Sequence, residues 1–536
     1  MHLRKYYYLI LIILLSLIAL WPFFKKGFFE SHDGEWMVIR FSAFHQTLVS
    51  GQFPVRFVDR LNGNFGYPVP NFLYPLPFYL AEIPKFLGFG FVDSIKTVFA
   101  ISSVVSAVAM FWALSQIFKR QAAFVGALLY LFVPYRFVDL YVRGSLGENV
   151  AFAFIPLSLG CLFKIKNGKP IFLPTLALSV AFLILSHNVI AVIFLPFFLA
   201  LARLLIKDHF IKVISAFLLG IMAAAFFWLP ALYDLQFVRL SQIKVSEVSH
   251  HLVTLADLIV PRWGYGPRPT GIGSFSPQAG LVSLAIFLGV FYLRIVGKVR
   301  SLLVDFLLLT FAVTFLLMSK ISIPFWQIVP FVDTVQFPWR LLSLSVFVTS
   351  LLAANIIENA TRKTAIATLL AIAAVISTIA YVRPVNFVDR NDGFYATNED
   401  TTTVQDEYLP LWVKEKPLQR AQNKFEAVEG QAEISPVSIR STIYKAHISA
   451  SQQSKIQINT IYFPGFEVNA NGRKLPINYQ NKYGLITFDL PPGEHNVIVN
   501  FTGSPVHVAS EAISSIALLI IGFTFYKLWS RKKIKN

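Results

Sequence analysis

Long apolar runs alternate with polar connections along most of the chain, and each run has about the length of a membrane-crossing helix. About 20 mostly apolar residues in a helix cross the hydrocarbon core of a bilayer. Twelve runs fit this description, and they cover residues 6–24, 95–118, 121–138, 148–163, 171–186, 188–206, 211–229, 279–297, 301–318, 341–358, 364–382 and 508–526. The pattern predicts a polytopic α-helical membrane protein with about twelve transmembrane helices.

Basic side chains gather at every second connection between these runs. The clusters are Arg4 and Lys5; Lys119 and Arg120; Lys164, Lys166 and Lys169; Arg203, Lys207 and Lys212; Arg294, Lys298 and Arg300; Arg362 and Lys363; and the tail Arg531–Lys535. Cytoplasmic connections of membrane proteins are enriched in Lys and Arg, so both termini are predicted to be cytoplasmic. The first run has no small-residue cleavage site before Lys25. We therefore expect a retained helix and not a removed signal peptide.

One apolar stretch, residues 72–90, is predicted not to cross the membrane. It contains Pro75, Pro77 and Pro84, and proline interrupts the regular hydrogen bonding of a helix. If the stretch crossed, the basic pair at 119–120 would face outward and the alternation would fail downstream. We expect it to lie embedded or at the interface on the outer side.

Three long regions remain on the outer side, and the last is polar and has the size of a domain. They are residues 25–94, 231–277 and 383–506. After Ala432, apolar and polar residues alternate in short runs separated by turn signals such as Asn471-Gly472, which is typical of antiparallel strands. The domains we expect are a transmembrane domain (1–382) with a large first outer loop, an extracytoplasmic β-sandwich (383–506), and a last helix with a basic cytoplasmic tail (507–536). Whether the sandwich binds carbohydrate or only packs as a lid stays open.

The composition excludes several classes of protein. Of 536 residues, 55% are hydrophobic and only 14% are charged, and the mean hydropathy is +0.59. These values exclude a soluble globular enzyme and a disordered chain. The net charge of +18 is explained by cytoplasmic connections, so we expect a lipid bilayer and no nucleic acid as partner. The single cysteine, Cys161, excludes an intrachain disulfide framework and a thiolate metal cluster.

The strongest candidate for chemistry directly follows the first apolar run, in the stretch SHDGEW at residues 31–36. Residues 34–50 after it carry an apolar stripe at helical spacing, which predicts a helix in the membrane interface that ends at Gly51. A carboxylate at its start, Asp33 or Glu35, could act as a catalytic base on a membrane-bound substrate. Alternatively, the same carboxylate caps the helix and complements its dipole.

Further polar side chains stand next to the apolar runs on the outer side, where ionisable groups are costly and are functional candidates by default. The candidate substrate- or phosphate-binding residues are Arg40, Arg56, Tyr67, Arg143, Glu148, His187 and Arg340. Arginine suits phosphate because it donates two parallel hydrogen bonds. Alternatively, Arg143 and Glu148 only tie helices together. Tyr67 could stack on a sugar, line a lipid groove or belong to an interfacial aromatic belt.

Motifs for common cofactors are missing from the sequence. It contains no P-loop, dinucleotide fingerprint, serine elbow or HExxH motif. The pair His250-His251 has no evident carboxylate partner, so we expect no metal site there. The sequence identifies no cofactor, although a divalent metal could bridge Asp33 and a phosphate.

Several stretches resemble one family of bacterial membrane proteins. They are SHDGEWMVIRFSAFHQTLVSGQFPVRF, NGNFGYPVPNFLYPLPFYL, VPYRFVDLYVRGSLGEN, SHN, VQFPWRLL, and YFPGFEVNANGRKLPI with GLITFDLPPGEHNVIVNF. In this order, and over nearly the whole chain, they resemble the polytopic 6-pyruvoyl-tetrahydropterin synthase-related family, which is close to the YfhO-like proteins. The family label names a pterin enzyme, but the sequence has no zinc-binding histidine set to support pterin chemistry. The resemblance implies a location in the bacterial cell membrane.

This family in turn resembles the GT-C glycosyltransferase superfamily, which implies a GT-C-like fold and sugar transfer from a polyprenyl-phosphate donor on the outer face. Such enzymes typically keep an acidic catalytic residue in the first outer loop, which matches Asp33, with Glu35 as the nearby alternative. Many relatives have an aromatic or aliphatic residue at the position of Glu35, which favours Asp33. The resemblance implies an inverting transferase with an envelope glycan, lipid or protein as acceptor.

Two alternatives of other classes stay open. The first is a transporter or flippase for a lipid-linked glycan, although the chain shows no internal repeat of the kind that transporters often have. The second is a non-enzymatic membrane protein that binds envelope glycans through the outer sandwich.

Overall fold

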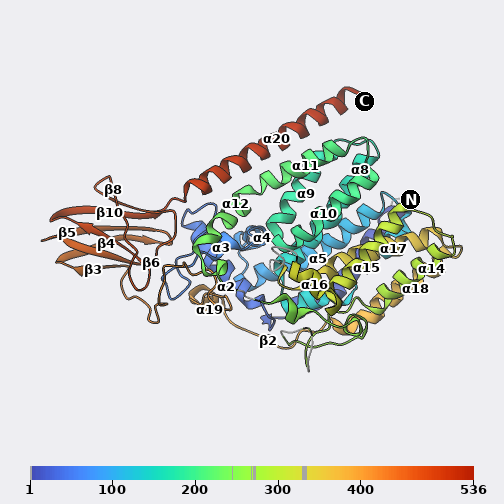
Figure 1. Cartoon of the computed structure of the whole chain (residues 1–536), viewed down its shortest axis with the longest axis horizontal. Coiled ribbons are helices and arrows are strands. Elements are labelled where there is room, and N and C mark those ends of the chain that lie inside the picture. The colour runs from blue at the N-terminus through green and yellow to red at the C-terminus, as the bar shows by residue number, and fades with distance from the viewer. Residues whose placement is uncertain (1–2, 244–245, 267–268, 270–272, 329–334, 536) are drawn as a thin grey trace.

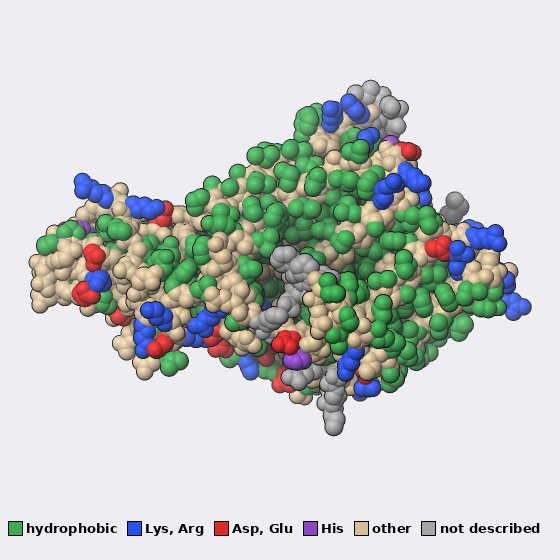
Figure 2. Space-filling model, viewed as in Figure 1, with side chains coloured by type: hydrophobic (Ala, Val, Ile, Leu, Met, Phe, Trp, Pro, Cys, Tyr) green, Lys and Arg blue, Asp and Glu red, His purple; other side chains and the backbone are tan. Residues whose placement is uncertain are grey.

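The computed structural model describes residues 3–243, 246–266, 269, 273–328 and 335–535. A bundle of helices forms most of the molecule, and a β domain projects from one end of it (Figure 1). Both termini lie at the opposite end of the bundle. Hydrophobic side chains cover the flank of the bundle, and basic side chains gather at the end that carries the termini (Figure 2). This distribution is typical of a bundle embedded in lipid.

The helices of the bundle coincide with the predicted apolar runs. Among the described residues, six are long and apolar enough to cross a membrane: α5 (Phe91–Leu114), α8 (Leu146–Lys166), α10 (Asn188–Leu205), α17 (Leu342–Asn359), α18 (Lys363–Thr378) and α20 (Pro505–Lys535). Two bent pairs each pass as one span: α6 (Arg120–Leu131) with α7 (Pro134–Phe137) and the π-helical turn η2 (Val138–Arg143), and α11 (Phe210–Ala223) with α12 (Ala225–Asp234). The shorter apolar helices are α1 (Leu3–Ala19), α9 (Phe172–Ser186), α14 (Leu281–Ile295) and α15 (Leu302–Met318). Each predicted run overlaps one of these helices, which confirms a helical membrane-type domain. The number of spans and the side of the membrane on which each loop lies stay predictions.

The proline-rich stretch at 72–90 forms only short helices. α3 (Val69–Phe72) has four residues and α4 (Leu76–Phe86) has eleven. At 1.5 Å per residue, α4 is about 16 Å long, roughly half the thickness of the hydrocarbon core. It is therefore too short to cross, as expected. Phe86 at its end is 91% exposed, which suits an interfacial position.

The β domain consists of two antiparallel sheets around a shared core. The larger sheet has the order β4-β5-β10-β7-β8, and the smaller one has the order β3-β6-β9. The strands are β3 (Phe425–Glu429), β4 (Ala432–Arg440), β5 (Ile443–Ala450), β6 (Ser454–Ile461), β7 (Phe466–Ala470), β8 (Arg473–Leu475), β9 (Leu485–Leu490) and β10 (Gly493–Phe501). Tyr444, Ile448 and Val497 of the larger sheet share a buried cluster with Ile458 and Phe488 of the smaller one. The predicted C-terminal β domain is thus confirmed.

The segment between the bundle and the first of these strands follows the first outer loop. Phe387–Val388 (β2) pairs with Phe28–Phe29 (β1). α19 (Asp392–Thr397) then packs on α2 (Gly34–Val49). The predicted helix at 34–50 therefore forms, but protein covers it. Its expected position in the membrane interface stays a prediction.

Side chains from the first outer loop fix the sandwich to the bundle. Phe57 is fully buried, and its ring centre lies 5.0 Å from that of Phe466 and 6.0 Å from that of Phe501. Nearby, the Lys424 ammonium donates to the Asp59 carboxylate at 2.5 Å. Burying this charge pair is costly unless both partners are present, so it holds the loop and the sandwich in one arrangement.

The predicted orientation can be tested with introduced cysteines, because the native Cys161 is fully buried. Gln452→Cys would lie in an exposed turn of the sandwich, and Asn167→Cys in the exposed connection after α8. In intact spheroplasts, we expect a membrane-impermeant maleimide to label Gln452→Cys and not Asn167→Cys, because that connection is predicted to be cytoplasmic. Both should react after lysis. The opposite pattern in intact spheroplasts would contradict the orientation.

Candidate active site

Asp33 stands at the start of α2, and its carboxylate has no partner in the part of the chain that the structure describes. The Ser31 hydroxyl oxygen accepts the hydrogen bond of the Gly34 amide at 3.1 Å, so Ser31 caps the helix. Among the described residues, the half-buried Asp33 side chain makes no hydrogen bond and no ion pair. The alternative that Asp33 serves as the side-chain cap is therefore wrong, and its carboxylate is available to a ligand.

Two backbone hydrogen bonds hold Asp33 against the end of the first bent pair. The amides of His32 and Asp33 donate to the carbonyl oxygens of Val142 and Arg143 at 2.9 and 2.8 Å. Gly144 permits this approach, because its φ is +62° and a Cβ there would come within 2.5 Å of the hydroxyl that caps α2. A larger residue at this position would strain the turn and displace the start of α2.

A cluster of buried charged side chains adjoins this contact. Glu148, fully buried at the start of α8, accepts from Arg143 Nη1 at 2.7 Å and from Arg340 Nε at 3.0 Å. Its other oxygen accepts from the Tyr135 hydroxyl at 2.8 Å, and Arg143 also donates to Asp139. The charges of two arginines and two carboxylates compensate each other, which offsets the free-energy cost of burying them.

The two arginines retain donors that the protein does not use. Arg143 donates only through Nη1, and Arg340 donates through Nε and Nη1. Among the described residues, the Nη2 of each arginine has no hydrogen-bond partner. The Trp339 ring centre lies 4.5 Å from the guanidinium carbon of Arg143, which supports its orientation. A phosphate oxygen could bind to these unused nitrogens.

His187, in the turn between α9 and α10, also belongs to the cluster. Its Nε2 lies 3.8 Å from a carboxylate oxygen of Glu148, and its Nδ1 accepts from the Ile190 amide at 3.3 Å. Because Nδ1 accepts, the proton of the neutral ring is on Nε2, on the side of Glu148. The Tyr74 ring centre lies 4.9 Å from that of His187.

Tyr74 connects the cluster with Asp33. Burial has the largest effect and raises the pKa of Tyr74, and the charge of Asp33 raises this pKa further. Arg40 lowers the pKa of Tyr74, Glu148 raises it and Arg340 lowers it. Asp33 and the buried cluster thus act electrostatically on one hydroxyl. Together with the backbone hydrogen bond from Asp33 to Arg143, this places them in one region, which we call the Asp33 site.

The second outer loop covers part of the Asp33 site. His32 Nε2 lies 2.8 Å from the carbonyl oxygen of Tyr265, and burial lowers the pKa of His32. His32 is therefore neutral at neutral pH, and its ring N–H can donate to that carbonyl. Phe275 of the same loop packs against Trp339 with ring centres 5.2 Å apart. These contacts reduce the access of water to the site.

Two predicted candidates instead join the first outer loop to the segment after the bundle. Glu35 accepts from the Tyr395 hydroxyl at 3.1 Å and lies 3.6 Å from Arg390. The fully buried Tyr67 hydroxyl lies 2.9 Å from that of Thr403. Glu35 and Tyr67 therefore have protein partners where Asp33 has none.

Two arginine candidates are engaged in the same way. Arg40 donates to the hydroxyl and the carbonyl oxygen of Thr402, and it is buried. Arg56 donates to Glu511 of α20 at 2.8 Å and to Asn71 at 3.4 Å. Arg40 remains within electrostatic reach of Tyr74, whereas Arg56 is bound to the start of the last helix.

Three residues of the Asp33 site are missing from the list of candidate binding residues: Tyr74, Tyr135 and Asp139. Asp139 and Tyr74 lie in stretches that the sequence singles out, at VDLYVRGSLGEN and in the aromatic run that begins at Tyr67, whereas Tyr135 was missed. Asp139 and Arg143 are four residues apart, a spacing that could have indicated their ion pair. No comparable signal marks the tyrosines, because each meets its partner only through the packing of separate elements.

Glu148→Gln tests the charge balance of the cluster. Glutamine keeps the shape of the side chain but leaves Arg143 and Arg340 buried with less negative charge, so we expect a stability loss of about 3 kcal/mol. The matched variant Glu35→Gln removes a partly exposed pair, and we expect a loss below about 1 kcal/mol. Unfolding of the purified proteins in detergent measures both. Equal stability of Glu148→Gln and the wild type would contradict the proposed balance.

Comparisons with known proteins place the chain in a family. No curated protein matches it. Among solved structures, it is similar to the arabinofuranosyltransferase AftD from Mycobacteria, with a TM-score of 0.46 and 15% identity over 73% of this chain and 28% of that chain. It is also similar to the oligosaccharyltransferase of Archaeoglobus fulgidus in the apo form, with a TM-score of 0.42 and 15% identity over 73% of this chain and 56% of that chain. A third similar structure is the archaeal oligosaccharyltransferase AglB from Archaeoglobus fulgidus in complex with an inhibitory peptide and a dolichol-phosphate. It gives a TM-score of 0.39 and 14% identity over 74% of this chain and 57% of that chain.

These similarities cover less than two thirds of each of the other chains. The model of the 6-pyruvoyl-tetrahydropterin synthase related domain, described as a membrane protein, matches residues 71–388, which is more than half of the chain. The chain therefore belongs to the 6-pyruvoyl-tetrahydropterin synthase-related family of membrane proteins, as its motifs predicted.

Proposed function

We propose that this protein is an inverting membrane glycosyltransferase, which moves a sugar from a polyprenyl-phosphate donor to an envelope glycan, lipid or protein acceptor on the outer face. The observation that carries the proposal is the Asp33 carboxylate, which has no protein partner among the described residues and whose backbone amide donates to the carbonyl oxygen of Arg143, an arginine that shares Glu148 with Arg340. A carboxylate base next to arginine donors suits sugar transfer from a phosphate.

In the proposed reaction, Asp33 accepts the proton of the acceptor hydroxyl while the hydroxyl oxygen attacks the anomeric carbon of the donor sugar. The bond between the anomeric carbon and the phosphate oxygen breaks, and its electron pair leaves with the polyprenyl phosphate. The anomeric configuration inverts. The departing phosphate is already ionised, so a strong general acid is not needed. A positioned base of this kind accelerates a reaction about 10²- to 10⁴-fold.

Arg143 and Arg340 are the residues that we propose to hold the donor phosphate, through the Nη2 atoms that have no partner among the described residues. Their bonds to Glu148 fix both guanidinium groups before the donor arrives. Fixed donors stabilise a developing charge without reorganising during the reaction. In this proposal, Arg40 and Arg56 support the site from its surroundings.

A divalent metal could also bridge Asp33 and the phosphate. Within the part of the chain that the structure describes, no group of three or more His, Cys, Asp or Glu side chains is placed to hold an ion. A bridging metal would take Asp33 as its protein ligand and the phosphate as its other ligand, and no step above depends on one.

Asp33→Asn tests the proposed base. The assay uses purified full-length protein, polyprenyl-phosphate carrying a radiolabelled hexose and a crude envelope-glycan acceptor. We expect transfer to fall at least about 100-fold, because asparagine keeps the size of the side chain but cannot take the proton. Glu35→Gln is the matched control and should transfer sugar at close to the wild-type rate.

Equal transfer by Asp33→Asn and the wild type would overturn the role of Asp33. Movement of the labelled lipid across vesicle membranes without sugar transfer would instead overturn the transferase proposal in favour of a transporter.

A further inference from the structure

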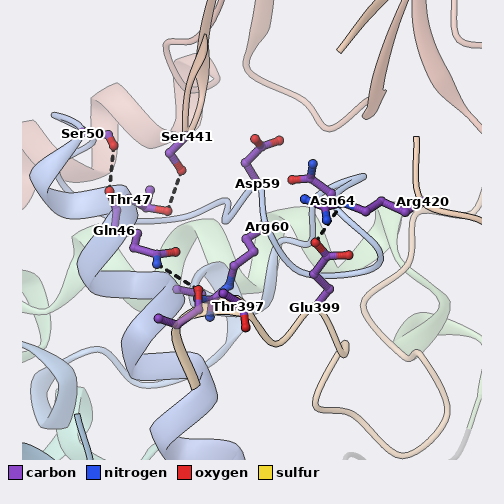
Figure 3. Close-up of a pocket in the computed structure, with 12 residues that line it drawn as sticks. Gln46, Thr47, Ser50, Asp59, Arg60, Asn64, Thr397, Glu399, Arg420 and Ser441 are labelled. Atoms are coloured by element: carbon purple, nitrogen blue, oxygen red, sulfur yellow. Dashed lines mark hydrogen bonds and ion pairs between the residues drawn. The ribbon is translucent and has the colours of Figure 1, made fainter. Parts of the chain in front are cut away.

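A cavity of about 350 Å³ lies between the C-terminal half of α2 and the outer domain. Its walls come from α2, from the loop that follows α2, from the segment after β2 and from the edge of the sandwich (Figure 3). Pockets of about 300 Å³ and more are large enough for small-molecule ligands. The cavity is separate from the Asp33 site, and none of the chemistry proposed above uses it.

The walls of the cavity are fixed by hydrogen bonds between separate parts of the chain. The Gln46 amide nitrogen donates to the carbonyl oxygen of Ala396 at 3.1 Å. The hydroxyls of Thr47 and Ser441 lie 2.7 Å apart. Arg60 donates from the loop to the Ser42 hydroxyl of α2 at 2.6 Å. The cavity is therefore preformed and does not depend on one flexible loop.

Three polar groups at the cavity have spare hydrogen-bonding capacity. Among the described residues, neither the side-chain oxygen of Gln46 nor the side-chain amide of Asn64 has a partner. Glu399 pairs with Arg420 through one oxygen at 3.2 Å, and its other oxygen has no partner within the described residues. Figure 3 shows Gln46 on one side of the cavity and Asn64 with Glu399 on the other. The set offers both donors and acceptors, which is what sugar hydroxyls need.

The charges at the cavity do not favour an anion. Two arginines and two carboxylates line it. Asp59 is bound to Lys424, and both terminal nitrogens of Arg60 donate to protein oxygens. The lining contains no aromatic and no large aliphatic side chain, so a lipid chain would find little apolar surface there. A neutral polyhydroxyl ligand remains the best chemical match.

We propose that this cavity binds an uncharged sugar unit of the acceptor glycan, an inference that rests on the proposed function for the identity of its ligand. Gln46 lies 13 residues after Asp33 along the chain, and a helix rises about 1.5 Å per residue. The cavity is therefore about 20 Å from the base. The bound unit lies several sugars away from the hydroxyl that reacts, so the cavity is a distal subsite for an oligosaccharide.

Protection of an introduced cysteine measures this binding directly. Ser50→Cys would line the cavity, Gln452→Cys would lie far away on the sandwich, and the native Cys161 is buried. The probe is a pool of neutral oligosaccharides, three to five sugars long, released from the envelope glycan of the organism by mild acid. With full-length protein in nanodiscs, we expect the pool to slow maleimide labelling of Ser50→Cys at least threefold and in a saturable way. Labelling of Gln452→Cys should not change.

Two asparagines in one loop provide a matched pair of variants. Asn64 and Asn62 both have positive φ angles, +68° and +61°, so glycine is tolerated at either position. Only Asn64 lines the cavity. In the Ser50→Cys background, Asn64→Gly should raise the half-protecting concentration about tenfold, the cost of roughly one hydrogen-bonding group, while Asn62→Gly leaves it unchanged.

The outcomes separate this inference from the proposed function. Absence of protection at millimolar oligosaccharide, or equal protection by inorganic phosphate, would overturn the sugar subsite. Equal effects of Asn64→Gly and Asn62→Gly would overturn it as well. Binding does not involve the base, so protection should persist in Asp33→Asn. If protection is found but no donor supports transfer, the subsite stands and the transferase proposal fails.

Discussion

The close contact between the start of α2 and the turn at residues 142–144 positions the rest of the site. Two backbone hydrogen bonds make the contact, and Gly144 supplies the space and the left-handed conformation that it needs. Because backbone atoms form the contact, the Asp33 side chain is not used to hold the helix, and Ser31 provides the cap instead. Among the described residues, the carboxylate is left without a partner, close to a cluster whose charges pair with one another. This division of tasks is what makes Asp33 the residue available for chemistry.

The buried cluster also explains how two arginines can stand at the end of a membrane bundle. An isolated guanidinium there would be costly, but Glu148 and Asp139 compensate both charges. The compensation uses some of the nitrogens and leaves others without partners. Such a cluster could serve stability alone, and its pairing by itself does not distinguish the two roles. What favours a site is the nearby Asp33 carboxylate, which has no partner among the described residues, and the effect of both Asp33 and the cluster on the pKa of Tyr74.

The sequence predicts the elements of this protein better than it predicts their neighbours. The apolar runs anticipate the bundle helices, and the stripe in residues 34–50 anticipates α2, because both patterns depend on local periodicity. The packing of α19 over α2 was not predicted, because it depends on contacts between distant parts of the chain. One such contact joins Glu35 and Tyr395, which are 360 residues apart. For the same reason, the sequence pattern alone did not distinguish Asp33 from Glu35 as the catalytic base. Only their partners in the fold distinguish a free carboxylate from an engaged one.

α2 is the element that relates the Asp33 site to the cavity. It is clamped along its length, by the turn at 142–144 at its start and by hydrogen bonds from Ser42, Gln46 and Thr47 to other parts of the chain. A clamped helix keeps its two ends at a fixed separation. A glycan that reaches both ends gains two binding regions for one loss of translational freedom, whereas a single sugar gains only one. On this argument, the protein would select acceptors by length, through the rigidity of one helix and without a dedicated recognition loop.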